Sequence, residues 1–144
     1  TVTPRQLYSR WINEFTQFVT PMDGMLETLK YLKQKYTLGL ITNGDAILQR
    51  AKVDCAGIKS YFSSIIISEE AGVEKPDKKI FSMCCRQLGL AKEKCIFIGD
   101  NYYADILGAL NAGLESIWII PDVRAAKIGK ITHVPSLWDL QRVL

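Results

Sequence analysis

The sequence predicts an α/β fold in which a parallel sheet lies between two layers of helices. Apolar runs of strand length alternate along the chain with longer segments whose apolar residues recur at helical spacing. Runs such as Ile65–Ile67 and Cys95–Ile98 are continuously apolar, as is typical of strands covered on both faces of a parallel sheet. Strands that alternate with helices are joined by right-handed crossovers, so we expect a three-layer, Rossmann-like architecture.

The first expected element is a helix over residues 4–19, whose wide apolar face includes Trp11. The turn at Pro21–Gly24 separates it from a second helix, which begins at Met25 and ends near Tyr36. Strands and helices then alternate. We expect strands at 37–41, 63–68, 95–99 and 116–120, a short edge strand at 131–134, and helices at 47–56, 77–88, 103–112 and from 137 onward.

The size and composition fit one globular domain. With 144 residues, 48% of them hydrophobic and 23% charged, the chain is long enough to bury one core. The net charge of +3 comes from scattered basic residues, so nucleic acid is not an expected partner. No apolar run is long enough for a membrane span, so a membrane is not an expected partner either. The four cysteines form no Cys-x-x-Cys pair, which favours reduced thiols and a cytoplasmic location.

Two aspartates follow the strand expected at 95–99. Asp100 lies at the carboxyl end of that strand, and we expect Asp105 to begin or directly precede the next helix. The carboxyl ends of parallel strands form the crevice where α/β proteins bind ligands. Two carboxylates about one helical turn apart suit Mg²⁺, which prefers oxygen ligands and keeps waters for a phosphate-bearing substrate. The alternative is that Asp100 caps a helix and Asp105 is a solvated acid in its first turn.

Two other polar stretches also follow strands. Thr42-Asn43-Gly44 combines a hydroxyl, an amide and a glycine before a helix, which is typical of a turn whose free N–H groups bind an anion, although Asn-Gly is also a common turn dipeptide. Lys75 precedes Pro76, which favours an extended Lys75 and a proline in the first turn of the next helix. A lysine held in this way can neutralise a phosphoryl oxygen or a carboxylate. The alternative is a surface lysine in an acidic loop.

The order of these three stretches resembles that of the haloacid dehalogenase-like (HAD) hydrolase superfamily. Thr42-Asn43-Gly44 is similar to its second motif, Lys75-Pro76 to its third, and Gly99-Asp100 with Asp105 to its fourth. The surrounding sequence resembles subfamily I, which has a helical cap, and within it the YjjG-type nucleotidases and the N-acylneuraminate-9-phosphatases. The likeness extends from about Thr20 to the C-terminus, in segments 41–45, 67–81 and 105–114.

The resemblance implies a Mg²⁺-dependent phosphatase that acts on a small phosphorylated metabolite, such as a nucleotide or sugar phosphate, through an aspartyl-phosphate. Thr42 would hydrogen-bond the phosphoryl group with the Asn43 backbone alongside, Gly44 would also belong to the substrate-binding loop, and Lys75 would offset the negative charge. Asp100 would ligate Mg²⁺, and Asp105 would hold the metal's water shell or ligate weakly. Such roles suit phosphoryl transfer, which needs positioning and charge neutralisation. The acidic pair favours a phosphatase over a haloacid dehalogenase, because the dehalogenases work without a metal.

One departure from the family pattern is the absence of its first motif, Asp-x-Asp, which supplies the nucleophile. We therefore expect residues 1–20 to be the last helix of the cap and residues 21–144 to be a core domain that lacks its first strand. In the family that strand lies at the centre of the sheet, between the strands that end at Thr42 and before Asp100. Its expected source is a preceding N-terminal segment of the same protein or a strand-exchanged copy, and we expect no phosphatase turnover from this chain alone.

Two other functions are open to the sequence. The chain could be a non-catalytic module that binds Mg²⁺ and phosphorylated ligands without turning them over. A response-regulator receiver also combines acids, a threonine and a lysine on a parallel sheet, but there the acids come first and the lysine last, the reverse of the order here.

Overall fold

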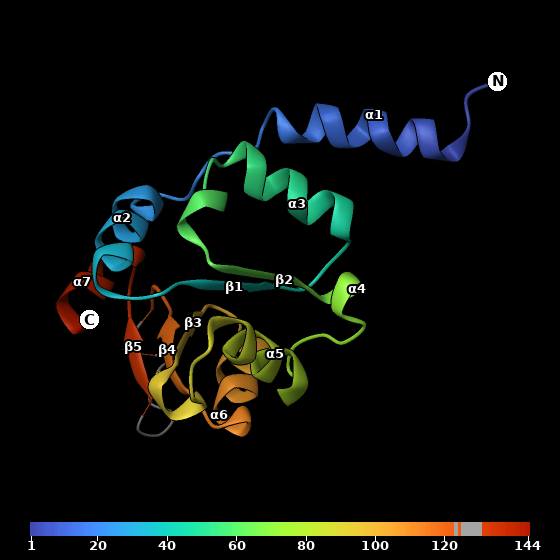
Figure 1. The fold of residues 1–144 in the computed structure, drawn as a ribbon. Helices are drawn as coiled ribbons and strands as arrows, with labels where there is room; N and C mark the ends of the chain where they lie inside the picture. Colours follow the sequence, from blue (N-terminus) through green and yellow to red (C-terminus); the bar gives the residue numbers. More distant parts are fainter. Residues whose placement is uncertain (123, 125–130) are drawn as a thin grey trace.

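The structure is a computed structural model that describes residues 1–122, 124 and 131–144. Every strand pairing in it is parallel and strands alternate with helices, so the predicted α/β class is confirmed. The main elements, most of them labelled in Figure 1, are α1 Pro4–Thr16, α2 Met25–Lys35, β1 Gly39–Thr42, α3 Ala46–Cys55, β2 Ser64–Ile67, α4 Ser68–Ala71, α5 Lys78–Leu88, β3 Ile96–Gly99, the π-helix η3 Tyr102–Leu107, α6 Gly108–Ala112, β4 Glu115–Ile119, β5 Thr132–Val134 and α7 Leu140–Val143. Short 3₁₀ turns lie at Lys59–Tyr61, Lys92–Lys94 and Leu137–Asp139.

Three expected elements differ from the observed ones. The first helix ends at Thr16 rather than at residue 19, and Pro21 disfavours a helical Thr20 just beyond it. Residues 69–71, expected as the start of a loop, form α4 together with Ser68, the expected last residue of the preceding strand. The helix expected at 103–112 is two elements, η3 and α6, because the chain makes a wide π-helical turn before it becomes α-helical.

The five strands of the described residues form two separate sheets. β1 pairs with β2 from Gly39↔Ser64 to Thr42↔Ile67, and β4 pairs with β3 on one side and β5 on the other. In the described part of the chain no pairing joins β1 to β3, the inner strands of the two sheets. Figure 1 shows β1 and β2 side by side, apart from the group of β3, β4 and β5.

β3 is less buried than the sequence predicts. Its continuous apolar run led us to expect a strand covered on both faces, but Ile96 is 42% exposed and Phe97, Ile98 and Gly99 are half-buried. Among residues 1–122, 124 and 131–144, β3 has a paired neighbour, β4, on one edge only, and no described strand covers its other edge. β2 behaves as predicted at its end, where Ile67 is fully buried.

Helices connect the two sheets on one face and close the second sheet on the other. α5 packs Phe81 and its buried neighbours against Ile41 of the first sheet, and Phe81 meets Phe97 of the second sheet edge to face at a centroid distance of 5.0 Å. On the opposite face Leu140 of α7 packs on Ile117 and Val134. α2 is tied to the C-terminal segment by a hydrogen bond from the Thr28 hydroxyl to the Leu137 carbonyl. Successive side chains of β3 point to opposite faces of the sheet, so β3 packs against helices on both faces.

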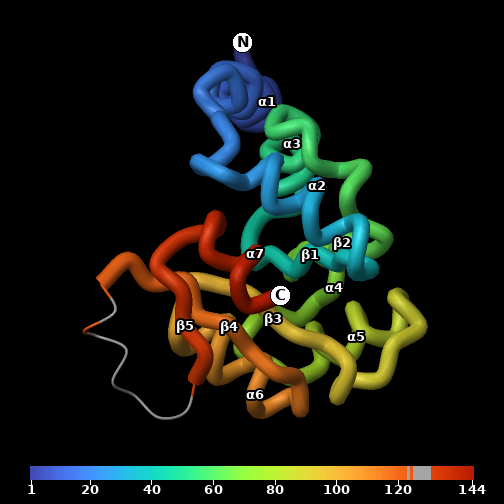
Figure 2. Tube along the Cα trace, turned by 90° about the vertical axis from the view of Figure 1, so that its left-hand side faces the viewer, coloured from blue at the N-terminus to red at the C-terminus, as the bar shows by residue number. Residues whose placement is uncertain are grey.

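α1 lies beside α3 and away from the strands (Figures 1 and 2). Its start is fixed by a capping box in which Thr3 and Gln6 bond reciprocally. Only Ile12 is buried, whereas Leu7, Trp11, Phe15 and Phe18 are exposed. The apolar face that the sequence predicts is therefore covered along one edge only. Within the described residues no helix has both the length and the apolar character needed to span a membrane.

Candidate active site

Side chains from three strand ends meet at one edge of the two sheets. The Asn43 amide follows β1 and binds the backbone of Lys75, which lies in the loop after β2 and α4. The Lys75 ammonium in turn lies 2.7 Å from a carboxylate oxygen of Asp105, in the helix after β3. The three predicted motifs therefore converge, and the carboxyl ends of both sheets point to the same place.

The ion pair between Lys75 and Asp105 is almost fully enclosed. Their side chains are 12% and 6% exposed, and the second Asp105 oxygen accepts a hydrogen bond of 3.0 Å from the Asn101 N–H. The Lys75 ammonium also lies 5.3 Å from the centre of the Phe97 ring. The alternatives of a solvated Asp105 and a surface Lys75 are therefore wrong.

The local backbone explains how Asp105 reaches this position. It lies inside the π-helical turn η3 rather than at or before a helix start, and the Ile106 N–H bonds back to the Asn101 carbonyl. Asn101 caps this turn by accepting a hydrogen bond from the Ala104 N–H, so Asp100 is not the cap. A Cβ atom on Gly99 would lie 2.4 Å from the Asp105 carboxylate, so a glycine is required there.

The loop after β1 is already hydrogen-bonded, which corrects the expectation of free N–H groups. The Gly44 N–H donates to the Ser68 hydroxyl at 2.9 Å, and the Ala46 N–H donates to Glu69 at 2.6 Å. Both acceptors belong to α4, the helix that the sequence did not predict. Ser68 could have been found by the rule that singled out Asp100, since it is the first polar residue after an apolar strand.

Two other predicted site residues have side chains without protein partners. The Thr42 hydroxyl at the end of β1 is half-buried, and the Asp100 carboxylate after β3 is exposed. Among the residues that the structure describes, neither group takes part in a hydrogen bond or an ion pair. The Asp100 carbonyl instead accepts a hydrogen bond of 2.9 Å from the Trp118 indole, which fixes the backbone beside the carboxylate. Both side chains are therefore available to a ligand.

The acidic pair fits a partial magnesium site. Its donors are hard carboxylate oxygens, and Mg²⁺ is usually held by one or two carboxylates together with waters and substrate phosphates. Asp100 offers a free carboxylate, while Asp105 is engaged with Lys75 and is suited to orienting groups around the ion. Residues 1–122, 124 and 131–144 contain no group of three or more histidines, cysteines and acids arranged to hold a metal. Further ligands would have to come from water, substrate or another segment.

A contact that the sequence did not predict ties α1 to this region. The Tyr8 hydroxyl donates a hydrogen bond to Asp45, which caps α3 directly after the Thr42-Asn43-Gly44 loop. The hydrogen bond raises the pKa of Tyr8 to about 12 and lowers the pKa of Asp45.

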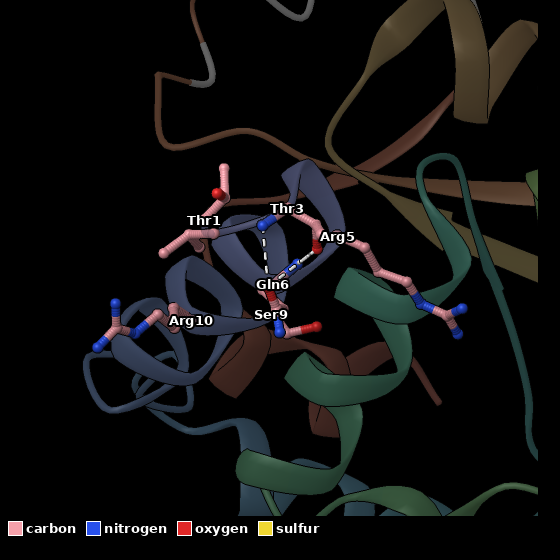
Figure 3. A pocket seen from close by; sticks show the side chains of 7 residues that line it. Thr1, Thr3, Arg5, Gln6, Ser9 and Arg10 are labelled. Atoms are coloured by element: carbon pink, nitrogen blue, oxygen red, sulfur yellow. Dashed lines mark hydrogen bonds between the residues drawn. The ribbon is translucent and has the colours of Figure 1, made fainter.

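A shallow hollow lies beside the first turn of α1 (Figure 3). Its lining includes Thr3, Arg5, Gln6, Ser9 and Arg10 and none of the predicted site residues.

Comparison with known proteins decides the family. A family model described as haloacid dehalogenase-like hydrolase matches residues 2–119. The chain belongs to the haloacid dehalogenase-like hydrolases. It is 35% identical to the pyrimidine 5'-nucleotidase YjjG of Escherichia coli over 146 aligned positions, and 36% identical to the human N-acylneuraminate-9-phosphatase over 115. These alignments cover 99% and 79% of this chain but only 65% and 46% of the two relatives.

Solved structures of the family share the fold. The HAD-hydrolase YfnB from Bacillus subtilis, whose structure is bound to magnesium, superposes with a TM-score of 0.83 at 28% identity, over 97% of this chain and 62% of YfnB. A HAD phosphatase from Thermococcus onnurineus gives a TM-score of 0.84 at 24% identity, over 94% of this chain and 63% of that protein. The chain therefore has the fold of a HAD-like hydrolase but spans less than two thirds of these relatives.

The Tyr8–Asp45 hydrogen bond gives a pH prediction. We expect Tyr8 to remain mostly protonated at pH 11 in the native protein, since its pKa is raised from 10.0 to about 12. The stability that the bond contributes is present below the unfolded pKa and is lost as the pH rises through the folded one. Asp45→Ala should return the Tyr8 titration towards 10.0. The titration of Tyr8 is measured as the difference in phenolate absorbance between the unsubstituted protein and Tyr8→Phe. A Tyr8 that titrates near 10 in the unsubstituted protein would contradict the prediction.

Proposed function

We propose that this chain is part of a Mg²⁺-dependent phosphatase that hydrolyses a small phosphorylated metabolite, such as a nucleotide or sugar phosphate, through an aspartyl-phosphate. The observation that carries the proposal is the enclosed Lys75–Asp105 ion pair, which lies at the joint carboxyl edge of the sheets. Asp100 follows β3 at the same edge, and its exposed carboxylate has no partner among the described residues. Positive and negative groups in this arrangement suit a phosphoryl group with its metal ion. The names of the relatives, a nucleotidase and a sugar-acid phosphatase, support the same substrate class.

Each predicted residue has a role in this proposal that its surroundings allow. The Thr42 hydroxyl donates a hydrogen bond to a phosphoryl oxygen, and the Lys75 ammonium offsets the charge of the group. Asp105 holds Lys75 in place, and Asp100 is a metal ligand. The metal ion, when bound, neutralises charge on the phosphoryl oxygens. The magnesium-bound structure of YfnB, which shares this fold, supports the choice of ion.

The nucleophile is the part of the proposal that lies outside these residues. The sequence contains no Asp-x-Asp, and no strand in the described part of the chain pairs with the inner edges of β1 and β3. We propose that a parallel strand between them carries the aspartate, supplied by an N-terminal segment of the same protein or by a second copy. An unpaired strand edge presents a row of N–H and C=O groups that is a ready template for pairing with another strand. The exposure of β3, whose composition is that of a central strand, supports a further strand along this edge.

A second candidate function is a non-catalytic module that binds Mg²⁺ and phosphorylated ligands. It rests on the same residues, because Asp100 and Lys75 can bind an ion and an anion without a nucleophile, whereas covalent turnover requires one. The two candidates differ in turnover alone. A haloacid dehalogenase is a weaker alternative, despite 30% identity to the 2-haloacid dehalogenase of Pseudomonas syringae, because the acidic pair is suited to a metal.

Turnover separates the two candidates. We expect the 144-residue chain alone to release no phosphate from nucleoside monophosphates, sugar phosphates or an aryl phosphate with Mg²⁺ present. The protein that includes the strand with the aspartate should hydrolyse at least one of them, and EDTA, Asp100→Asn or Lys75→Ala should each reduce turnover at least about 10²-fold. Hydrolysis by the chain alone that Asp100→Ala abolishes would mean that the nucleophile lies within it. An inactive whole protein that binds Mg²⁺ and phosphate would favour the module.

Hydrogen exchange tests the missing strand. In the chain alone, amides on the inner edges of β1 and β3 should exchange rapidly, because no strand accepts their hydrogen bonds. In the protein with the additional segment, or in a strand-exchanged dimer, the same amides should become protected, whereas those of β4, paired on both sides, should change little. Light scattering distinguishes the two sources of the strand, because a second copy makes a dimer whereas an N-terminal segment of the same protein leaves a monomer. Protected inner edges in a monomer of this chain would contradict the proposal.

A further inference from the structure

We infer that Asn43 is a positioning residue for Lys75 and acts through its side-chain amide rather than through contact with the phosphoryl group. This inference rests on the proposed function, in which Lys75 offsets phosphoryl charge. It adds a role for the side chain to the one expected of the Asn43 backbone, because the side-chain amide points to another residue of the site.

The amide holds the Lys75 backbone at both of its polar groups. The Lys75 N–H donates to Asn43 Oδ1 at 2.9 Å, and Asn43 Nδ2 donates to the Lys75 carbonyl at 3.0 Å. One side chain thus satisfies a donor and an acceptor of the same residue, as a neighbouring strand would. Among the described residues the Lys75 backbone has no backbone partner. Its conformation therefore depends on Asn43.

The backbone of Lys75 has few other constraints. Pro76 follows it without an N–H group, and α5 begins only at Lys78 after the cap Asp77, so Pro76 lies before the helix and not in its first turn as predicted. Asn43 is itself held, since its carbonyl accepts a hydrogen bond of 3.1 Å from the Gln49 side chain on α3. The positions of β1 and α3 therefore fix the Asn43 amide and, through it, the backbone of Lys75.

This contact also spans the two sheets. Asn43 follows β1 of the first sheet, and the ammonium of Lys75 reaches Asp105 beyond β3 of the second. The path from Asn43 through Lys75 to Asp105 joins the two sheets at the site, where the described strands do not pair with one another. Loss of the amide would leave the ammonium free to shift relative to a bound phosphoryl group, and a displacement of ~1 Å at a reacting centre can reduce the rate about 10²-fold.

A double-mutant cycle in the whole, Mg²⁺-loaded protein tests this role. Asn43→Ala should lower kcat/KM at least about tenfold in the native background and should have almost no further effect in Lys75→Ala, because the residues act as a unit. Asn43→Asp, which keeps the shape and the acceptor but loses the donor, serves if the alanine variant does not fold. Asn111→Ala, on the exposed face of α6, is the matched control and should leave kcat/KM unchanged.

A second readout does not require activity. The ¹³Cε resonance of Lys75, assigned with Lys75→Ala, should move in Asn43→Ala and Asn43→Asp but not in Asn111→Ala. If Lys75→Ala remains fully active, the proposed function fails, and the resonance still decides whether Asn43 positions the lysine. If Lys75→Ala is inactive while Asn43→Ala retains its native rate, or if the two losses simply add, the role of Asn43 is overturned and the proposed function stands.

Discussion

The buried ion pair between Lys75 and Asp105 is the interaction on which the site depends. It joins the loop after β2 to the turn after β3, across two sheets between which the structure describes no strand pairing. Removal of either partner would leave an uncompensated charge in a nearly closed space, at a cost of about 3–5 kcal/mol. The backbone is adapted to the pair. Gly99 leaves room for the carboxylate, the Asn101 N–H binds its second oxygen, and Asn43 fixes the lysine from the other side.

The position of the charged site between two separate sheets bears on its function. The chain supplies a cation, a buried acid that holds it and a free carboxylate, which are the groups that stabilise charge during phosphoryl transfer. Its sequence has no Asp-x-Asp, and the edges of β1 and β3 that no described strand pairs with border this same place. In our proposal one additional strand supplies both the missing backbone partners and the nucleophile. Folding and catalysis would then be completed by the same segment.

The sequence predicted the strand ends well because the relevant signal is local. A polar residue directly after an apolar run marks the carboxyl end of a parallel strand, and that rule located Thr42 and Asp100. It could not predict that Asp105 lies in a π-helical turn, because this depends on the fit of its carboxylate against Gly99. The occupied N–H groups of Gly44 and Ala46 were missed for a similar reason, since their acceptors come from a distant helix of one turn.

Burial was the least predictable property. The run Ile96–Ile98 has the composition of a central strand, yet its exposure is set by whether a neighbour lies along its free edge. The burial of the aromatic face of α1 was equally hard to predict. The periodicity predicted an apolar face but did not predict how much of that face would be buried. The composition of a segment shows which kind of surface it can pack against. Whether the segment is buried also depends on whether a partner lies against it.

The most direct test of the account is calorimetric titration of the whole protein with orthovanadate, a phosphate analogue, with and without Mg²⁺. If Asp100, Lys75 and Asp105 form the charged half of a phosphoryl-transfer site, vanadate and Mg²⁺ should each strengthen the binding of the other by the same factor. Asp100→Asn should remove this coupling. Vanadate binding that is equally tight without Mg²⁺ and in Asp100→Asn would contradict the account.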